Sequence, residues 1–72
     1  MTYRIVAARQ MKSEILTAIE ANEQIRDRNK IIIRRVLDGE TYKSVGADFN
    51  ICGERVRVIC FFTFRQKLGL SI

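Results

Sequence analysis

Apolar residues recur at intervals of three and four positions along most of the chain, the spacing that places them on one face of an α-helix. No Pro or Gly interrupts this pattern in the first 21 residues, so we expect an amphipathic N-terminal helix over residues 1–21. The opening stretch Thr2–Val6 mixes β-branched and aromatic side chains and also fits an extended arm. The periodicity then continues and predicts three further helices, over residues 22–37, 42–49 and 53–67.

Residues with known preferences at helix ends mark these boundaries. Asn22 is suited to cap the N-terminus of the second helix and Thr41 that of the third, because their side-chain oxygens can accept a hydrogen bond from a free backbone N–H. Gly39 and Gly69 suit the left-handed backbone that commonly ends a helix. The chain has no internal repeat and no linker long enough to divide it, which predicts a single domain over residues 1–72.

The segment from Thr41 to Leu68 has the spacing of a helix-turn-helix, in which two short helices pack at a steep angle. Apolar or small residues fall at the offsets that this packing needs: Val45, Gly46, Phe49, Ile51, Val56 and Ile59. Between the two helices, Asn50 tolerates the left-handed backbone of a sharp turn. We therefore predict an all-α fold, a four-helix domain with a C-terminal helix-turn-helix.

The charge balance indicates a kind of partner. The 13 Lys and Arg against 8 Asp and Glu give a net charge of +5, which favours an acidic polymer, most simply nucleic acid. The alternative is that a basic surface only keeps a small domain soluble. The cations of the second helix either line a DNA backbone or form a solvated face. They are Arg26, Arg28, Lys30, Arg34 and Arg35. In an extended N-terminal arm, Arg4 and Arg9 would also reach DNA.

Several function classes are not expected. No stretch approaches the roughly 18 uncharged apolar residues of a membrane span, and the N-terminus lacks the apolar core of a secretory signal. We therefore expect a cytoplasmic protein with no membrane partner. The chain has no His, no paired carboxylates and no glycine-rich phosphate loop, so an enzyme is not expected, and neither is a cofactor or a metal.

Two cysteines, Cys52 and Cys60, lie along the predicted fourth helix. Their sulfurs would be about 12 Å apart along the helix axis, which excludes a disulfide between them. Cys52 stands at the start of this helix. A small cap residue is tolerated there, and a thiolate that senses oxidation would be favoured there by the helix N-terminus.

Short motifs lie at fixed distances from one another within residues 25–68. They are Leu37-Asp38-Gly39 with Thr41, then Val45-Gly46 and Phe49, then Glu54-Arg55-Val56-Arg57 and Ile59. In this order and spacing the segment resembles region 4 of bacterial sigma factors. The resemblance implies that residues 22–72 form a region 4-like part, whose last helix enters the major groove of DNA.

The resemblance also assigns roles to single residues. Glu54 and Arg57 match the family's base-contacting glutamate and arginine, and Arg55 matches an arginine that contacts the backbone. Thr41 matches a position that touches phosphate at a helix N-terminus. The chemistry agrees, because Arg can donate two hydrogen bonds to guanine and Glu can accept one from cytosine. The predicted DNA-binding set is Thr41, Lys43, Gly53, Glu54, Arg55, Arg57 and Val58.

Two members of this set depart from the family. Gly53 and Val58 stand where the family has arginine and glutamine, so the promoter specificity of sigma factors is not implied. Val58 can meet a thymine methyl group or belong to an interface. The C-terminal half of this helix also exchanges charged for aromatic residues. It carries an apolar stripe of Phe61, Phe64 and Leu68.

An apolar stripe of this size must be covered. Either the N-terminal helix folds back onto it or a second copy of the chain does. We predict that Phe61, Phe64 and Leu68 form a dimer or partner interface. A dimer would present two recognition helices to a site with two-fold symmetry.

These observations favour a sequence-specific DNA-binding regulator of transcription, a repressor or activator that acts as a homodimer on double-stranded DNA. The alternative is a sigma region 4 mimic that binds RNA polymerase or a sigma-binding partner, with Ile31, Ile33 and Leu37 as its contacts. A third possibility is a structural or inhibitory dimer that no longer reads DNA, which the losses at Gly53 and Val58 keep open.

Overall fold

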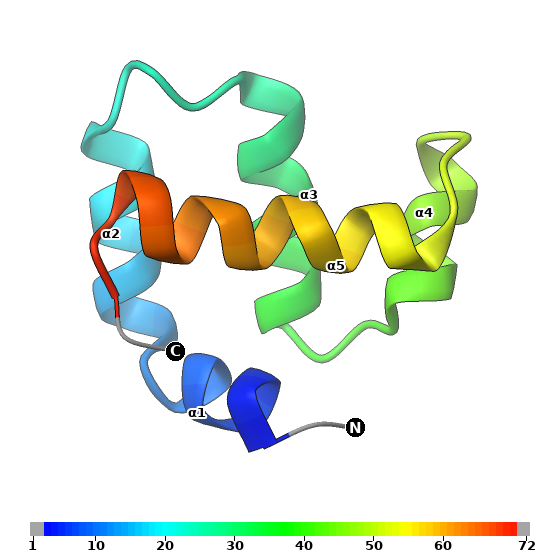
Figure 1. The fold of residues 1–72 in the computed structure, drawn as a ribbon, viewed down its shortest axis with the longest axis horizontal. Coiled ribbons are helices and arrows are strands. Elements are labelled where there is room, and N and C mark those ends of the chain that lie inside the picture. The colour runs from blue at the N-terminus through cyan, green and yellow to red at the C-terminus, as the bar shows by residue number, and fades with distance from the viewer. Residues whose placement is uncertain (1–2, 71–72) are drawn as a thin grey trace.

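The computed structural model describes residues 3–70, with side chains from Ile5 onward, and every regular element in this range is a helix (Figure 1). The elements are α1 (Tyr3–Gln10), α2 (Lys12–Ala21), α3 (Asp27–Leu37), α4 (Tyr42–Asp48), α5 (Gly53–Phe62) and the π-helix η1 (Thr63–Lys67). The predicted all-α class is confirmed. No helix of this range is long and apolar enough to cross a membrane.

The rod formed by α5 and η1 organises the molecule. It runs across α3 and α2, with α4 at its N-terminal end and α1 below it (Figure 1). The predicted helix over residues 53–67 is thus found, although its last five residues have π geometry. Leu68 follows as the C-cap, and Gly69 adopts a φ of +68°, as expected for the residue that ends a helix.

The prediction of a single N-terminal helix is wrong, because the chain bends at Met11 and forms α1 and α2. Ile5 and Ala8 of α1 lie in the same buried cluster as Ile15 and Ile19 of α2. In one straight helix, Ile5 and Ile19 would be about 21 Å apart along the axis, too far to share a small core. The alternative of an extended arm does not hold for residues 3–6, which are helical. Thr2 and the side chain of Arg4 lie outside the described residues.

Asn22 does not cap the second helix of the prediction. It is the C-cap residue of α2, and its Oδ1 accepts a hydrogen bond from the backbone N–H of Gln24 at 2.9 Å. This local turn uses the side chain that was expected to start a helix, so α3 begins only at Asp27. The other end of α3 agrees with the prediction, since it stops at Leu37 and Gly39 follows with a φ of +111°.

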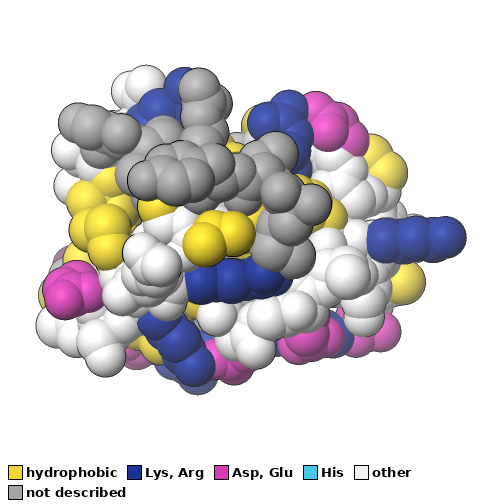
Figure 2. Space-filling model, turned by 90° about the horizontal axis from the view of Figure 1, so that it is seen from below, with side chains coloured by type: hydrophobic (Ala, Val, Ile, Leu, Met, Phe, Trp, Pro, Cys, Tyr) yellow, Lys and Arg dark blue, Asp and Glu magenta, His cyan; other side chains and the backbone are white. Residues whose placement is uncertain are grey.

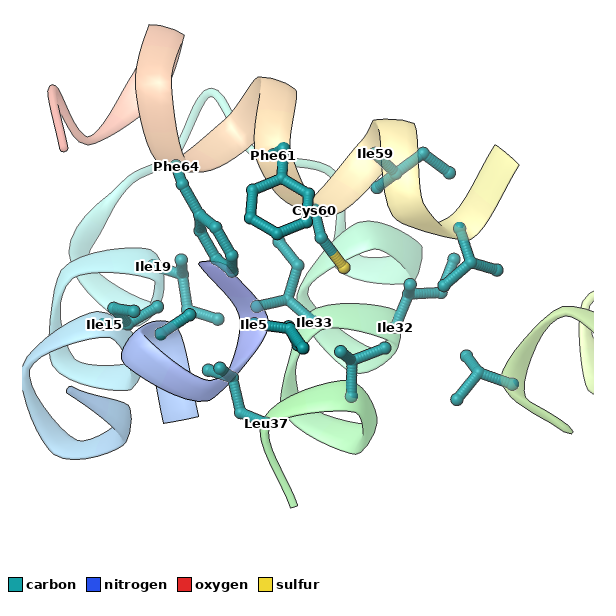
Figure 3. Close-up of a cluster of buried hydrophobic side chains, with 14 of the residues drawn as sticks. Ile5, Ile15, Ile19, Ile32, Ile33, Leu37, Ile59, Cys60, Phe61 and Phe64 are labelled. Carbon is teal, nitrogen blue, oxygen red and sulfur yellow. The ribbon is translucent and has the colours of Figure 1, made fainter. Parts of the chain in front are cut away.

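The rings of Phe61 and Phe64 lie inside the molecule, and the prediction that they form an interface is wrong. They meet edge to face with centroids 5.6 Å apart. Both are buried in one cluster with isoleucines of α1, α2 and α3 (Figure 3). Leu68, the third residue of the stripe, is half-buried against the same cluster. The N-terminal helices therefore cover this stripe, which was the alternative to coverage by a second copy of the chain.

The buried side of α5 and η1 is wider than the wheel of an isolated amphipathic helix predicts. Val56, Ile59 and Thr63 are buried, and so are Phe61 and Phe64 of the predicted interface stripe. The rod lies over the other helices, so its N-terminal part packs on α3 and α4, while Phe61 and Phe64 further along reach the isoleucines of α1, α2 and α3 (Figure 3). The π geometry adds to this, because an i→i+5 bond, seen from Leu68 N–H to the Thr63 carbonyl at 3.1 Å, shifts the side chains that follow.

Candidate nucleic-acid interface

Helices α4 and α5 pack closely through a short turn at residues 49–52. Thr41 caps α4, its Oγ1 accepting a hydrogen bond from the Ser44 backbone N–H at 3.1 Å. Asn50 adopts a φ of +57°, as its sequence position predicted. A Cβ built on Gly46 would lie 2.5 Å from the Ile51 carbonyl oxygen, which only a glycine avoids. Local sequence therefore fixes how α5 leaves the turn.

Gly53 has a packing role that the predicted DNA contact did not include. A Cβ on this residue would lie 3.2 Å from the Lys43 backbone nitrogen, so the first residue of α5 rests against the first turn of α4. This contact also brings Lys43, another predicted site residue, beside the start of α5. Lys43 is exposed, so α4 contributes a cationic residue close to the start of α5.

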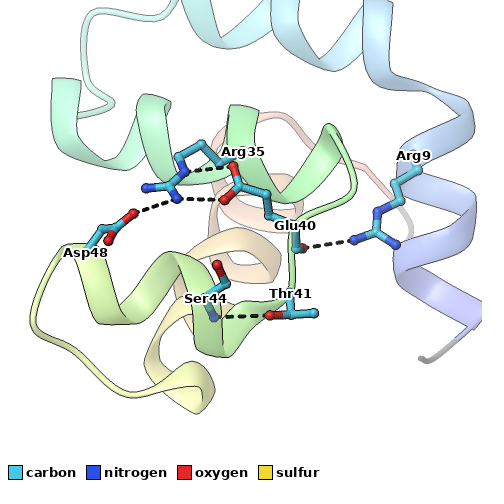
Figure 4. Close-up of polar contacts among 6 residues, drawn as sticks. All are labelled: Arg9, Arg35, Glu40, Thr41, Ser44 and Asp48. Atoms are coloured by element: carbon cyan, nitrogen blue, oxygen red, sulfur yellow. Dashed lines mark hydrogen bonds and ion pairs between the residues drawn. The ribbon is translucent and has the colours of Figure 1, made fainter.

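Arg35, Glu40 and Asp48 form a polar cluster that holds α4 against α3 (Figure 4). Arg35 donates to both Glu40 oxygens at 2.8 and 2.6 Å and lies 2.6 Å from an Asp48 oxygen. Hydrogen bonding from Arg35 holds the pKa of the Glu40 carboxyl below its ordinary value of 4.5. From the opposite side, Arg9 donates to the Glu40 carbonyl at 3.1 Å. The cluster fixes the loop before α4, and with it the position of the α4–α5 pair.

These contacts engage several of the cations proposed as backbone contacts. Arg35 is engaged as described, and Arg34 forms an ion pair with Glu20 of α2. Arg9, the candidate of an extended arm, donates to the carbonyls of Val36 and Glu40. Arg26 and Arg28 at the start of α3 remain exposed, and Lys30 is half-buried.

The outer face of α5 holds the predicted base contacts together. Glu54 and Arg57 form an intrahelical ion pair, with Arg57 Nε donating to Glu54 Oε2 at 3.0 Å. Hydrogen bonding from Arg57 lowers the pKa of Glu54, and the carboxylate in turn raises the pKa of Arg57. The two side chains form one unit in which the arginine charge offsets the carboxylate that would otherwise repel phosphate.

Charge along the α5–η1 rod has a single dominant sign. Its cations are Arg55, Arg57, Arg65 and Lys67, and its one carboxylate is the paired Glu54. The face on which α1 lies is different, because there blue cations and magenta carboxylates are interspersed (Figure 2). The net charge of +5 is therefore not spread evenly, and the outer face of α5 is the surface suited to an acidic polymer.

Two apolar side chains stand on the same face of α5. Val58 is 41% exposed and Phe62 is 55% exposed. The sequence pattern identified Val58 but missed Phe62, because it assigned the interface role on this helix to Phe61 and Phe64. The usable signal was the spacing of Glu54, Val58 and Phe62, which recur every four residues and share one face.

Tyr42 at the start of α4 is partly buried, with a hydroxyl that has no hydrogen-bond partner among the described residues. Burial raises the pKa of this phenol. It borders a cavity of about 150 Å³ that is also lined by Ile5, Arg9, Glu40 and Thr41.

Both cysteines are free, and they differ in environment. Cys60 is buried, and desolvation raises the pKa of its thiol to about 12, so this sulfur remains protonated at neutral pH. Cys52 is exposed at the N-cap of α5 and makes no side-chain capping bond. Within residues 3–70, no three His, Cys, Asp or Glu side chains gather into a set that could hold a metal ion.

The predicted site residues fall into three groups. Lys43, Glu54, Arg55, Arg57 and Val58 lie on α5 or beside its start. Thr41 and Gly53 position the two helices, and the aromatic stripe belongs to the core. Comparisons with models of known protein families, with curated proteins and with solved structures found no match.

Proposed function

We propose that this protein is a sequence-specific, duplex DNA-binding regulator of transcription, in which α4 and α5 form a helix-turn-helix and α5 enters the major groove. The observation that carries the proposal is the outer face of α5, where an exposed Glu54–Arg57 pair lies among cations with no unpaired carboxylate on the rod. The resemblance of residues 25–68 to sigma region 4 supports the same assignment of α5.

The side chains divide between bases and phosphates. Arg57 suits guanine, because its guanidinium can donate to O6 and N7 together. Glu54 keeps acceptor capacity for a cytosine amino group while it orients Arg57. Arg55 and Lys43, which have no carboxylate partner in the described contacts, suit flanking phosphates. The helix diameter of about 10–12 Å matches a major groove of about 12 Å.

In this proposal a single copy of the chain binds DNA. The predicted homodimer rested on Phe61, Phe64 and Leu68, which pack into the core of their own chain. A symmetric dimer on DNA would therefore need another surface. DNA reading does not depend on one, since α5 is presented by the packing within one chain.

The alternative of a polymerase-binding mimic is not favoured by the contacts. Of the three side chains proposed to grip a polymerase, Ile33 and Leu37 are buried and Ile31 alone is exposed. One exposed isoleucine does not form an apolar groove or ridge of the size that protein partners use.

The proposal is tested by titrating the purified protein into a labelled random-sequence duplex at several salt concentrations. Three to five phosphate contacts predict that affinity falls by roughly two orders of magnitude between about 50 and 200 mM salt. Fluorescence anisotropy measures this directly. Affinity that does not depend on salt, or no binding at the lowest salt, would contradict duplex binding by this cationic face.

A further inference from the structure

We propose that Val58 and Phe62 make α5 a reader of thymine methyl groups, so that the preferred duplex carries thymines where these side chains meet it. The inference rests on the proposed function and names the base chemistry of that site. It starts from an unusual pairing on one helix face, a cationic surface with exposed apolar side chains at its centre.

The exposed side chains of Val58 and Phe62, here called the Val58–Phe62 ridge, suit contact with the edge of a base better than contact with a phosphate. Arg55 borders this ridge on one side, and Arg57 and Arg65 border it on the other. Arg55 and Arg65 would hold phosphates while Arg57 contacts a base beside the ridge, which leaves the ridge to face the floor of the groove. The apolar group that duplex DNA displays there is the C5 methyl of thymine.

Spacing along the helix agrees with this assignment. Val58 and Phe62 are four residues apart, which corresponds to about 6 Å along the helix axis. Successive base pairs are separated by about 3.4 Å. The two side chains therefore cover positions about two base steps apart, with Val58 nearer the N-terminal end of α5 that enters the groove.

A second copy of the chain is a poorer occupant for the ridge. Two side chains provide far less than the roughly 800 Å² per partner of a stable protein interface. Ridge-to-ridge contact would also bring the arginines of both copies together, and the nearby Glu54 is already paired with Arg57. The flanking positive charge instead complements a polyanion.

The experiment uses a duplex selected by the full-length protein from a random pool. Each thymine is replaced in turn by deoxyuridine, which pairs identically and lacks only the methyl group. We expect affinity to fall about fourfold at one or two positions, the effect of burying one methyl-sized group. In the Val58→Ala variant, at least one of these positions should lose its sensitivity to uracil.

Two variants complete the design. Ile31→Ala shortens an apolar side chain that is 48% exposed on α3, and it should leave the uracil effect unchanged. Phe62→Ala is expected to reduce the effect at a second thymine without changing the solution mass.

The proposal is overturned if the wild-type protein binds all uracil duplexes as tightly as the parent, or if Val58→Ala keeps the full uracil effect. A lower solution mass for Phe62→Ala would assign the ridge to a second copy. If duplex binding is absent at every salt concentration, the proposed function fails and this inference fails with it. Salt-dependent binding without uracil sensitivity removes only the thymine reading.

Discussion

Replacing Phe64 with Ala is expected to destabilise the protein by about 3–5 kcal/mol, the usual range for removing a buried aromatic ring. The ring is fully buried and packs edge to face on Phe61, among isoleucines of the N-terminal helices. A chain of 72 residues has a total stability of only roughly 4–11 kcal/mol. The midpoint of thermal unfolding should therefore fall by more than about 12 °C, or the variant should not fold at all.

Phe62→Ala is the matched control, because it removes the same ring from the exposed side of the same helix. Its stability should change by less than about 0.5 kcal/mol. The wild-type midpoint should not depend on protein concentration, since the aromatic stripe is covered within one chain. A midpoint that rises with concentration, together with a small effect of Phe64→Ala, would restore the dimer interface that the sequence suggested.

Replacing Arg57 with Ala is expected to weaken binding to a selected duplex by about 1–3 kcal/mol and to weaken binding to random duplex much less. The loss has two sources. A bidentate contact to guanine disappears, and Glu54 is left without the partner that offsets its charge near phosphate. Arg57→Lys should keep most of the salt dependence and lose much of the specificity, because lysine lacks the planar fork of donors.

Arg34→Ala provides the control for Arg57→Ala. Arg34 also forms an exposed ion pair with a glutamate, but its partner is Glu20 on α2. The substitution removes the same charge, so a general electrostatic effect would appear equally in both variants. A loss for Arg57→Ala below about 1 kcal/mol, or an equal loss for Arg34→Ala, would contradict base reading by α5.

The sequence predicted local geometry well wherever one residue decides it. Thr41 caps α4, Asn50 takes the left-handed turn, and Gly39 and Gly69 follow helix ends, because each depends only on its own backbone preference or on neighbours within three residues. Gly46 was correctly read as a point of close approach. The helix ends and turns that such residues determine depend little on the rest of the fold.

Predictions that depended on distant parts of the chain failed. The break at Met11 arises because α1 and α2 must both reach one core, and no local residue signals it. Whether Phe61 and Phe64 are buried or form an interface depends on where α1 and α2 pack, which the periodicity of a single helix does not reveal. The prediction that Asn22 caps a helix failed for another reason. Its side chain can cap a helix or stabilise a local turn, and in the structure it accepts a hydrogen bond from Gln24 in a turn.

The candidate site was predicted in outline and changed in detail. Glu54, Arg55 and Arg57 lie on the exposed side of α5, and Glu54 and Arg57 form an ion pair that the sequence analysis did not include. Arg35 was predicted as a DNA-backbone contact but forms ion pairs with Glu40 and Asp48 instead. These two carboxylates come within its reach only when α4 packs on α3. Phe62 became a candidate site residue because Phe61 and Phe64 are buried in the core and leave Phe62 as the exposed aromatic side chain of this helix.

The most direct test of DNA reading by α5 is an amide chemical-shift map recorded while an unlabelled duplex is added to the isotopically labelled protein. The largest changes are predicted at Lys43 and along α5 from Gly53 to Phe62, with small changes in α2 and in the C-terminal half of α3. Changes concentrated on α1 and α2, or none at a duplex concentration that saturates binding, would contradict the account.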